Sequence, residues 1–222
     1  MRLAIAKHMS ESVATAPHVT ALFELDFTSI MAHRVANKAD FAAKGVKLTY
    51  TAYFIMACVE AMKAVPTVNS RWHDDKLQIF GDVNIGVGTS LGTEGLVVPV
   101  VKQAQNKGLL GVATDLQDIT SRARENKLKP ADVKGGTFTI SNHGVSGSLV
   151  ASPIIINQPQ SAILGIGKLE KRVIVKTVDD QDVIAIKPMA FVSLTIDHRV
   201  LDGHQTNRWL SRFVEVLENW TD

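Results

Sequence analysis

Residues 190–204 read AFVSLTIDHRVLDGH, an apolar run that ends in a crowd of ionisable side chains. The run 190–196 is typical of a buried β-strand, and the spacing of apolar residues over about 203–220 predicts a helix behind it. Between strand and helix lie Asp197, His198, Arg199, Asp202 and His204. A buried strand that leads through a polar turn into an amphipathic helix points to an α/β fold.

The rest of the chain alternates between helical and extended patterns. Further helices are predicted over residues 2–16, about 28–44, about 49–64 and 108–128. Strands are predicted over 18–27, 76–81, 83–91, 96–101, 136–141, 161–167, 172–178, 182–187 and 190–196. The whole chain, residues 1–222, is therefore predicted to be one α/β domain of two layers, a mixed sheet with helices covering one side of it.

Several details of the helices follow from their residues. In the first helix an apolar stripe is expected from Leu3, Ile5, Ala6, Met9 and Val13. Thr28 or Ser29 is expected to cap the second helix, which stops at Gly45. The third helix is apolar nearly all round and is expected to be central. The last helix is expected to bury Trp209, Leu210, Phe213, Val214 and Leu217.

The bulk composition excludes several classes of protein. A net charge of +2 without a long basic run gives no indication of nucleic-acid binding. The apolar run 48–64 is short and contains Glu60 and Lys63, so it predicts a buried helix rather than a membrane span. Cys58 is the only cysteine, which excludes an intrachain disulfide and favours a packed thiol in a reducing compartment. No signal peptide is indicated at the N-terminus.

Nucleotide, metal and serine-hydrolase sites are not supported by the motifs. The glycines at 86, 88 and 92 and at 165 and 167 do not have the G-x-G-x-x-G spacing of a dinucleotide site. The seven histidines form no H-E-x-x-H or comparable ligand set, so no metal site is predicted. A G-x-S-x-G elbow is also missing from the sequence.

Two stretches remain as candidates for chemistry. His198 stands at the predicted end of a buried strand, where neutral imidazole is suited to act as a general base. The alternative is a solvated, ion-paired turn in which His198 is a bystander. The strand 136–141 ends in the polar tip Ser141-Asn142-His143-Gly144, whose hydroxyl is suited to bind an oxyanion or merely to cap the strand.

These stretches carry a family resemblance. DHRVLDG resembles the D-H-R-x-x-D-G signature of the dihydrolipoamide acyltransferases, the core components of 2-oxo-acid dehydrogenase complexes. GGTFTISNHG, PIIINQPQSAILGIG, GLVVPVV, APHVT and RLAIAKHM are similar to the same family in the same order. The resemblance covers essentially the whole chain and implies a fold similar to that of chloramphenicol acetyltransferase, associating as homotrimers that build a larger cubic or icosahedral core.

The resemblance also implies roles for individual residues. His198 is the implied general base, and Ser141 of the adjacent subunit is the implied oxyanion donor. Asp202 matches the second aspartate of the signature, whose implied role is to hold the active-site turn through an ion pair. Asn142 and Gly144 are placed at the substrate-binding loop as residues that shape it, and His204 is only a neighbour.

The implied reaction transfers an acyl group between an S-acyl-dihydrolipoyl group and coenzyme A, which is a substrate; no metal takes part. The lipoyl group and the peripheral-subunit-binding domain are expected on segments outside these residues. Expected partners are the lipoyl domain, the 2-oxo-acid decarboxylase and dihydrolipoamide dehydrogenase, with no nucleic acid or membrane, in the bacterial cytoplasm or mitochondrial matrix. The stretch GSLVASPIIINQPQSAIL, residues 147–164, resembles succinyl-transferring members, whereas APHVT and Ser141 resemble acetyl or branched-chain members, so the acyl group stays open.

Two other functions remain open on this fold. The first is a stand-alone chloramphenicol-type O-acyltransferase; those relatives tend to carry His-His where this chain has Asp197-His198, which argues against it. The second is a non-catalytic assembly scaffold, for which Ser141, His198 and Asp202 would not all be needed.

Overall fold

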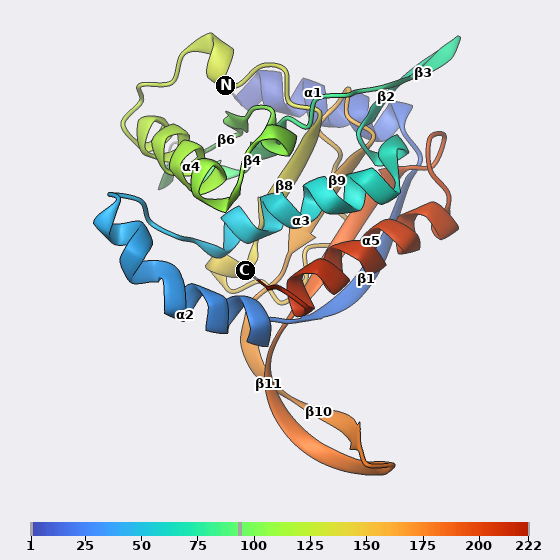
Figure 1. The fold of residues 1–222 in the computed structure, drawn as a ribbon. Coiled ribbons are helices and arrows are strands. Elements are labelled where there is room, and N and C mark those ends of the chain that lie inside the picture. The colour runs from blue at the N-terminus through green and yellow to red at the C-terminus, as the bar shows by residue number, and fades with distance from the viewer. Residues whose placement is uncertain (1, 93–94, 222) are drawn as a thin grey trace.

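The computed structural model describes residues 2–92 and 95–221, and Figure 1 shows their fold. The helices are α1 (Arg2–Thr15), α2 (Thr28–Ala43), α3 (Tyr50–Ala64), α4 (Leu109–Arg124) and α5 (Gly203–Glu218). The strands are β1 (His18–Asp26), β2 (Ser70–His73), β3 (Lys76–Ile79), β4 (Ile85–Val87), β5 (Thr89–Ser90), β6 (Leu96–Val97), β7 (Val100–Val101), β8 (Phe138–Asn142), β9 (Ala162–Ile166), β10 (Glu170–Val178) and β11 (Gln181–Asp197).

A seven-stranded mixed sheet forms the centre of the molecule. Its order is β1-β11-β9-β8-β4-β7, and β10 pairs with β11. β8 runs parallel to β4 and β9, whereas the other pairs of this sheet are antiparallel. The two strands predicted over 182–187 and 190–196 are one strand of 17 residues, β11, because β10 pairs with its first half while β1 and β9 pair with its second. The predicted α/β fold with a mixed sheet is confirmed.

The core lies between this sheet and the layer formed by α3 and α5. Alternate residues of β8 and β11, such as Phe138 and Val192, join the buried apolar cluster, as strand geometry requires. From α5, Trp209 stacks on Phe213 with ring centroids 5.4 Å apart, and both side chains are fully buried. The predicted inner face of α5 is confirmed except at Val214, which is only partly buried. The central position of α3 is confirmed, because most of its side chains are buried.

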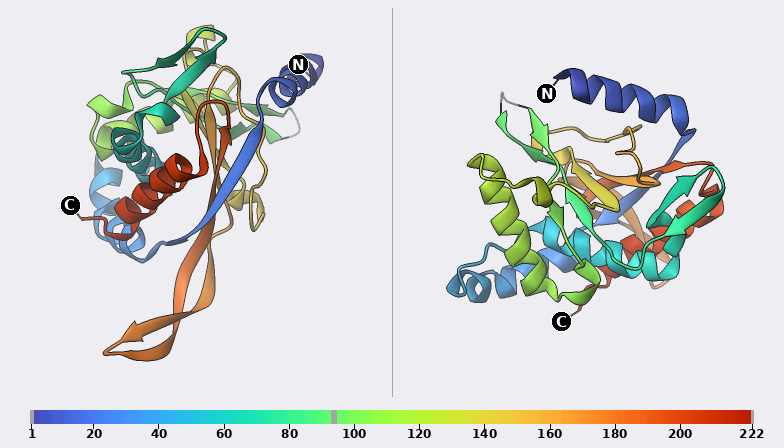
Figure 2. Two further views of the ribbon diagram at one scale, coloured as in Figure 1. Left: turned by 90° about the vertical axis from the view of Figure 1, so that its right-hand side faces the viewer. Right: turned by 90° about the horizontal axis from the view of Figure 1, so that it is seen from above.

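α1 is the exception among the helices. Figure 2 shows it on the side of the sheet away from α3 and α5, where the Ser12 hydroxyl donates to the Ile156 carbonyl at 2.7 Å. The helix forms as predicted, but its apolar stripe is not buried: Leu3 is 88% exposed and Val13 57%. The reason is that α1 meets the rest of the chain through Ser12 and His8 rather than through that stripe.

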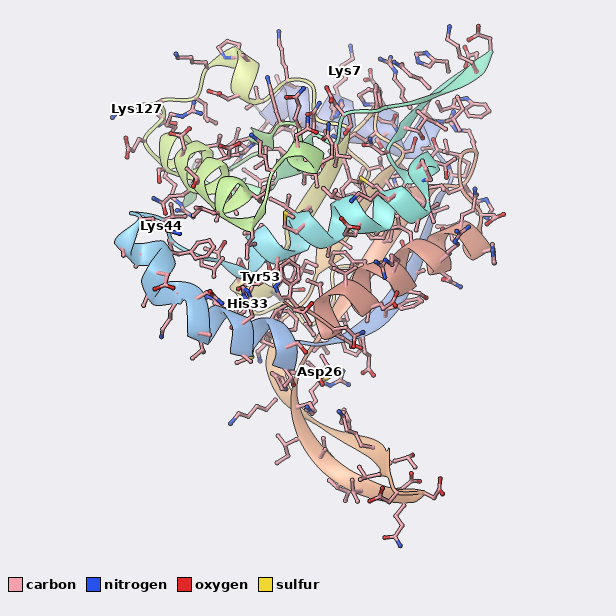
Figure 3. All side chains as sticks on the ribbon, in the orientation of Figure 1. Lys7, Asp26, His33, Lys44, Tyr53 and Lys127 are labelled. Atoms are coloured by element: carbon pink, nitrogen blue, oxygen red, sulfur yellow. The ribbon has the colours of Figure 1, made fainter. Side chains whose placement is uncertain are left out.

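The second helix, α2, is capped differently from the prediction. Asp26, labelled in Figure 3, accepts a hydrogen bond from the Thr28 N–H at 2.8 Å, and neither Thr28 nor Ser29 caps the helix with its own side chain. Partial burial of Asp26 acts to raise the pKa of its carboxyl group. Hydrogen bonds from Thr28 and the nearby Lys187 outweigh this effect, so the pKa lies below its ordinary value. Gly45 follows α2 at φ +73°, a conformation that glycine adopts without strain.

Two hairpins extend from the body of the molecule (Figure 1). The first joins β2 to β3; β2 was not predicted. The second is the outer part of β10 and β11, in which Val173 lies opposite Ile186 and Val175 lies opposite Ile184. All four side chains are at least 66% exposed, so this hairpin presents an apolar face to solvent. No helix in the described part of the chain is long and apolar enough to cross a membrane.

Candidate active site

The turn after β11 carries His198, whose side chain is exposed. Its backbone is held in place: the N–H of His198 donates to the Pro17 carbonyl at 2.9 Å. One residue earlier, the N–H of Asp197 donates to the Ser161 carbonyl at 2.8 Å. His198 therefore stands at the end of a buried strand, as the apolar run predicts, with a free imidazole on a firmly anchored backbone.

Asp197 and Arg199, on either side of His198 in the sequence, form an ion pair in which the carboxylate is buried and the guanidinium is partly exposed. Asp197 is 1% exposed, and its carboxylate accepts hydrogen bonds from Arg199 Nε at 3.0 Å and Nη2 at 2.6 Å. These hydrogen bonds raise the pKa of the Arg199 guanidinium, and they outweigh the opposite effect of its partial burial. The carbonyl of Asp197 also accepts the N–H groups of Val200 and Leu201 at 2.9 and 3.1 Å. The alternative of a solvated turn is therefore wrong for Asp197.

Asp202 begins α5 as its N-cap. Its carboxylate accepts the N–H of Gln205 at 2.8 Å, while the Gln205 side chain accepts the N–H of Asp202 at 3.2 Å. This reciprocal arrangement is a capping box. Within the described chain the ion pair of the turn is made by Asp197 and Arg199 and not by Asp202. His204, in the first turn of α5, is exposed.

The polar tip predicted after strand 136–141 lies at the end of β8. Ser141 and Asn142 are half-buried final residues of that strand. A Cβ atom on Gly144 would lie 2.1 Å from the carbonyl oxygen of Gly167, so only glycine lets these two backbones approach. His143 beside it is exposed. Gly144 therefore shapes the loop, in agreement with the prediction.

Ser141 and His198 lie far apart within one chain. In the sheet Ser141 pairs with Gly165, and Gly165 pairs with Ser193, five residues before His198. Two strand spacings and five residues of extended chain place the two Cα atoms about 19 Å apart. One chain alone therefore does not bring the two candidate catalytic side chains together.

A cavity of about 580 Å³ opens beside the end of β8, against α3, α4 and β5. Asn142 lines it, and Lys47 and Arg124 supply positive charge. Hydroxyl groups on its wall come from Thr49, Thr51, Thr89, Ser90, Thr120 and Ser121. An adjacent cavity of about 350 Å³ shares Lys47 and adds Arg34 and Lys38. The two cavities together are suited to a ligand that is long, polar and negatively charged.

Sequence reasoning missed two serines that anchor the His198 turn. The Ser161 hydroxyl donates to the Ser70 carbonyl at 2.9 Å, and the two hydroxyls lie 3.0 Å apart. Both residues are fully buried. Ser161 could have been suspected because it is a small polar residue at the start of the apolar run SAILGIG. Ser70 is distant from Ser161 and from His198 in the sequence, and no motif marks it.

No group of three histidine, cysteine, aspartate or glutamate side chains that could hold a metal ion occurs among residues 2–92 and 95–221. Cys58 is fully buried, and burial raises the pKa of its thiol well above the ordinary value. It lies in α3, within the apolar core. The packed thiol predicted from the sequence is confirmed.

Comparison with known proteins gives matches that cover nearly the whole of this chain. The family described as 2-oxoacid dehydrogenases acyltransferase (catalytic domain) matches residues 1–222. A succinyltransferase component of the 2-oxoglutarate dehydrogenase complex from Rickettsia bellii is 39% identical over 99% of this chain and 54% of its own length. In Bacillus subtilis, the acyltransferase component of the branched-chain alpha-keto acid dehydrogenase complex is 39% identical, and the acetyltransferase component of the pyruvate dehydrogenase complex 38%, each over 99% of this chain. The chain spans about half the length of these curated relatives.

Solved structures with a similar fold include the same kind of acyltransferase. A dihydrolipoamide acetyltransferase of Azotobacter vinelandii, studied for the role of a serine, a histidine and an asparagine in its catalytic mechanism, has a TM-score of 0.91 at 31% identity, covering 98% of this chain and 88% of its own. The cubic core of a pyruvate dehydrogenase multienzyme complex matches with the same values. Chloramphenicol acetyltransferase, at 14% identity, TM-score 0.60 and coverage of 97% and 94%, shares the fold alone. The chain belongs to the family of 2-oxoacid dehydrogenase acyltransferases and corresponds to the catalytic domain of that family.

Proposed function

We propose that this domain transfers an acyl group between an S-acyl-dihydrolipoyl group and coenzyme A, with His198 as the general base. The observation that carries the proposal is the exposed His198 imidazole on a backbone anchored to Pro17 and Ser161, in a chain of this family. A base must stand at a defined position in order to take a proton during attack.

The proposed reaction needs only proton transfer and stabilisation of an oxyanion. The coenzyme A thiol, like an ordinary thiol with a pKa of about 8.5, is mostly protonated at neutral pH. His198 takes its proton as the sulfur attacks the thioester carbonyl, and the resulting tetrahedral oxyanion accepts a hydrogen bond from the Ser141 hydroxyl. The intermediate collapses to acyl-coenzyme A, and the departing dihydrolipoyl sulfur takes the proton back from His198.

The site is proposed to be shared between copies of the chain arranged as a trimer. Support comes from the separation of about 19 Å between Ser141 and His198 within one chain, which the sheet spacings give. Two exposed apolar surfaces, the stripe of α1 and the hairpin face around Val173 and Ile184, are available for contact between copies. Assembly of trimers into a larger core agrees with the cubic core of the pyruvate dehydrogenase relative.

Asp202 is proposed to act as a structural residue of the turn. In the Azotobacter enzyme the asparagine follows the histidine by four residues, and Asp202 follows His198 by the same interval. Asparagine and aspartate are equally good helix N-caps, so both fit the capping position observed for Asp202. This agreement supports capping as the shared property of the position.

Coenzyme A is proposed to enter through the two cavities near β8. Its phosphates would pair with Lys47, Arg124, Arg34 or Lys38, and its pantetheine arm would run towards Asn142 and Ser141. Basic side chains are the usual ligands of phosphate groups. The second substrate is proposed to come from a lipoyl domain, with the 2-oxo-acid decarboxylase and dihydrolipoamide dehydrogenase acting before and after this step.

The acyl group is proposed to be succinyl, acetyl or branched-chain. The relatives do not separate these three, because their identities are 39%, 38% and 39% respectively. Initial rates with succinyl-, acetyl- and isobutyryl-coenzyme A, each with free dihydrolipoamide, will select among them. An enzyme that uses none of the three would contradict the proposed reaction.

Two variants test the mechanism and the shared site together. His198→Ala should lower kcat by a factor of about 100 to 10,000, the usual contribution of a positioned base. Ser141→Ala should lower it by about 100- to 1000-fold. When the two variants are unfolded together in equal amounts and reassembled, about a quarter of all sites should combine an intact His198 with an intact Ser141, because the contact is head-to-tail. Near wild-type turnover in His198→Ala, or no recovery in correctly assembled mixtures, would contradict the proposal.

A further inference from the structure

The hairpin of β2 and β3 has no part in the function proposed above, yet its tryptophan lies against the active-site turn. Figure 2 shows this hairpin beside the turn that leads into α5. The Arg199 guanidinium carbon lies 5.6 Å from the centre of the Trp72 ring. Trp72 is 36% exposed, so it covers the guanidinium with one face while its remaining surface meets solvent. At this distance the contact is a cation–π interaction.

Arg199 is held by two groups at once. The guanidinium meets the Trp72 ring and, through Nε and Nη2, the Asp197 carboxylate at 3.0 and 2.6 Å. Asp74, at the tip of the same hairpin, adds an electrostatic attraction on Arg199. The orientation of the guanidinium is therefore set jointly by the hairpin and by the strand that carries the base.

Asp197 passes this constraint to His198. Its carboxylate also accepts the backbone N–H of Arg199 at 3.0 Å, so the side chain of Asp197 bridges from the residue before His198 to the residue after it. Asp197 is 1% exposed, and its carboxylate bonds both the backbone and the guanidinium of Arg199. A shift of the guanidinium would therefore be passed to the turn that carries the imidazole.

A second connection runs between the hairpin and the turn through buried hydroxyls. Ser70, the first residue of β2, accepts a hydrogen bond from the Ser161 hydroxyl at 2.9 Å. The Ser161 carbonyl in turn accepts the N–H of Asp197 at 2.8 Å. The first residue of β2 and the end of β11 are thus both bonded to Ser161, which holds the hairpin that carries Trp72 next to the turn that carries Arg199.

We propose that Trp72 is a positioning residue for the transfer reaction: its ring holds Arg199 against Asp197 and thereby orients His198. The inference rests on the proposed role of His198 and extends it to a hairpin outside the site. Trp72 acts on the orientation of the base and makes no contact with substrate. Its loss therefore lowers kcat and leaves KM for both substrates nearly unchanged.

The experiment compares Trp72→Leu with Trp72→Phe in the assembled protein. Leucine covers Arg199 with apolar surface but has no aromatic face, whereas phenylalanine keeps one. Trp72→Leu should lower kcat about three- to tenfold, the rate equivalent of a partly exposed cation–π contact. Trp72→Phe should retain at least half of the wild-type kcat. Ile79→Ala, an exposed apolar residue of the same hairpin, is the matched control and should have wild-type kinetics.

A double-mutant cycle with Arg199→Lys tests whether Trp72 acts through Arg199. Lysine keeps the charge but does not bind carboxylate in the bidentate manner of arginine. Trp72→Leu should lower kcat much less in the Arg199→Lys background than in the wild type, because the contact through which it acts is already altered. Equal losses in both backgrounds, or equal losses in Trp72→Leu and Trp72→Phe, would overturn the proposal.

Hydrogen exchange at the Arg199 Nε–H, followed by NMR, separates this inference from the proposed function. Exchange should accelerate in Trp72→Leu and stay at the wild-type rate in Ile79→Ala. If His198→Ala proves fully active, the role of His198 fails although the exchange result still shows the contact. If His198→Ala is inactive and exchange at Arg199 is unchanged in Trp72→Leu, the positioning role of Trp72 fails alone.

Discussion

Asp202 offers a direct test of whether a helix cap or a charge holds the active-site turn. Substituting alanine removes the acceptor for the Gln205 N–H at 2.8 Å and breaks the capping box. Loss of such a cap costs about 1 kcal/mol, within a range of about 0.5 to 2. In a chain of this size that corresponds to a fall of about 2–4 °C in Tm.

Substituting asparagine separates the two explanations. Asp202→Asn keeps an acceptor of the same shape, and asparagine is as good an N-cap as aspartate. The charge itself, exposed at the first turn of α5, interacts with the helix dipole by a few tenths of a kcal/mol once salt screens it. Asp202→Asn should therefore lower Tm by less than about 1 °C in 0.2 M salt.

The assay measures thermal unfolding by circular dichroism and steady-state kinetics on the same preparations. Asp202→Ala should lower kcat several-fold because the first turn of α5 frays beside His198, whereas Asp202→Asn should stay within about twofold of wild type. His204→Ala, an exposed neighbour in the same helical turn, is the control and should change neither quantity. Equal losses of stability and activity in the asparagine and alanine variants would refute the capping argument and favour an ion pair made by Asp202 in the assembled protein.

Three further predictions concern other parts of the chain. Gly144→Ala should lower the free energy of unfolding by about 3 kcal/mol, because its methyl group would lie 2.1 Å from the Gly167 carbonyl oxygen. Gly111→Ala in α4, where the nearest atom is a Lys107 side-chain atom at 3.5 Å, is the control and should be neutral or stabilising. Urea unfolding measures both variants, and equal stabilities would contradict the prediction. The pKa of Asp26 is held below its ordinary value, so its ionised form stabilises the fold above the unfolded-state pKa of about 4 and this contribution is lost as the pH falls through the lower folded-state value. Asp26→Asn should accordingly be less stable than wild type at pH 7, and the difference should shrink below about pH 4; a constant difference in unfolding scans from pH 3 to 7 would refute it. Cys58, fully buried and with its thiol pKa raised by burial, should react with a disulfide reagent only upon unfolding, so rapid labelling of the native protein would be the contrary result.

Much of the fold could be predicted because local patterns dominate it. The bounds of α3 and α5 follow from helical periodicity within two residues, whereas α4 ends at Arg124, four residues before its predicted end. The α/β class follows from the order of helical and extended segments. β2 was missed because Trp72 is the only apolar residue among its four, so the segment shows no alternation of apolar and polar side chains. The cap of α2 was assigned to Thr28 or Ser29 because every such residue resembles a cap in sequence, whereas the end of β1 places Asp26 at the N–H groups.

Part of the candidate site was also visible in the sequence. His198 and Ser141 each end an apolar run, and the resemblance assigned them to different subunits. The structure adds the reason, since β8, β9 and β11 place them far apart in one sheet. The burial of Asp197 was not predicted, because charged residues near a turn are usually solvated and only the packing of β11 shows otherwise.

The helices, most of the strands, the family and the candidate base can be read from the amino-acid sequence, because these properties depend on residue type and spacing along the chain. The contacts that hold the turn around that base are visible only in the folded chain: Pro17 on the backbone of His198, Ser161 on the backbone of Asp197, and Trp72 over Arg199. These contacts join segments that are more than thirty residues apart. They depend on the order and register of the strands in the sheet, and the spacing of residues along the sequence does not show either.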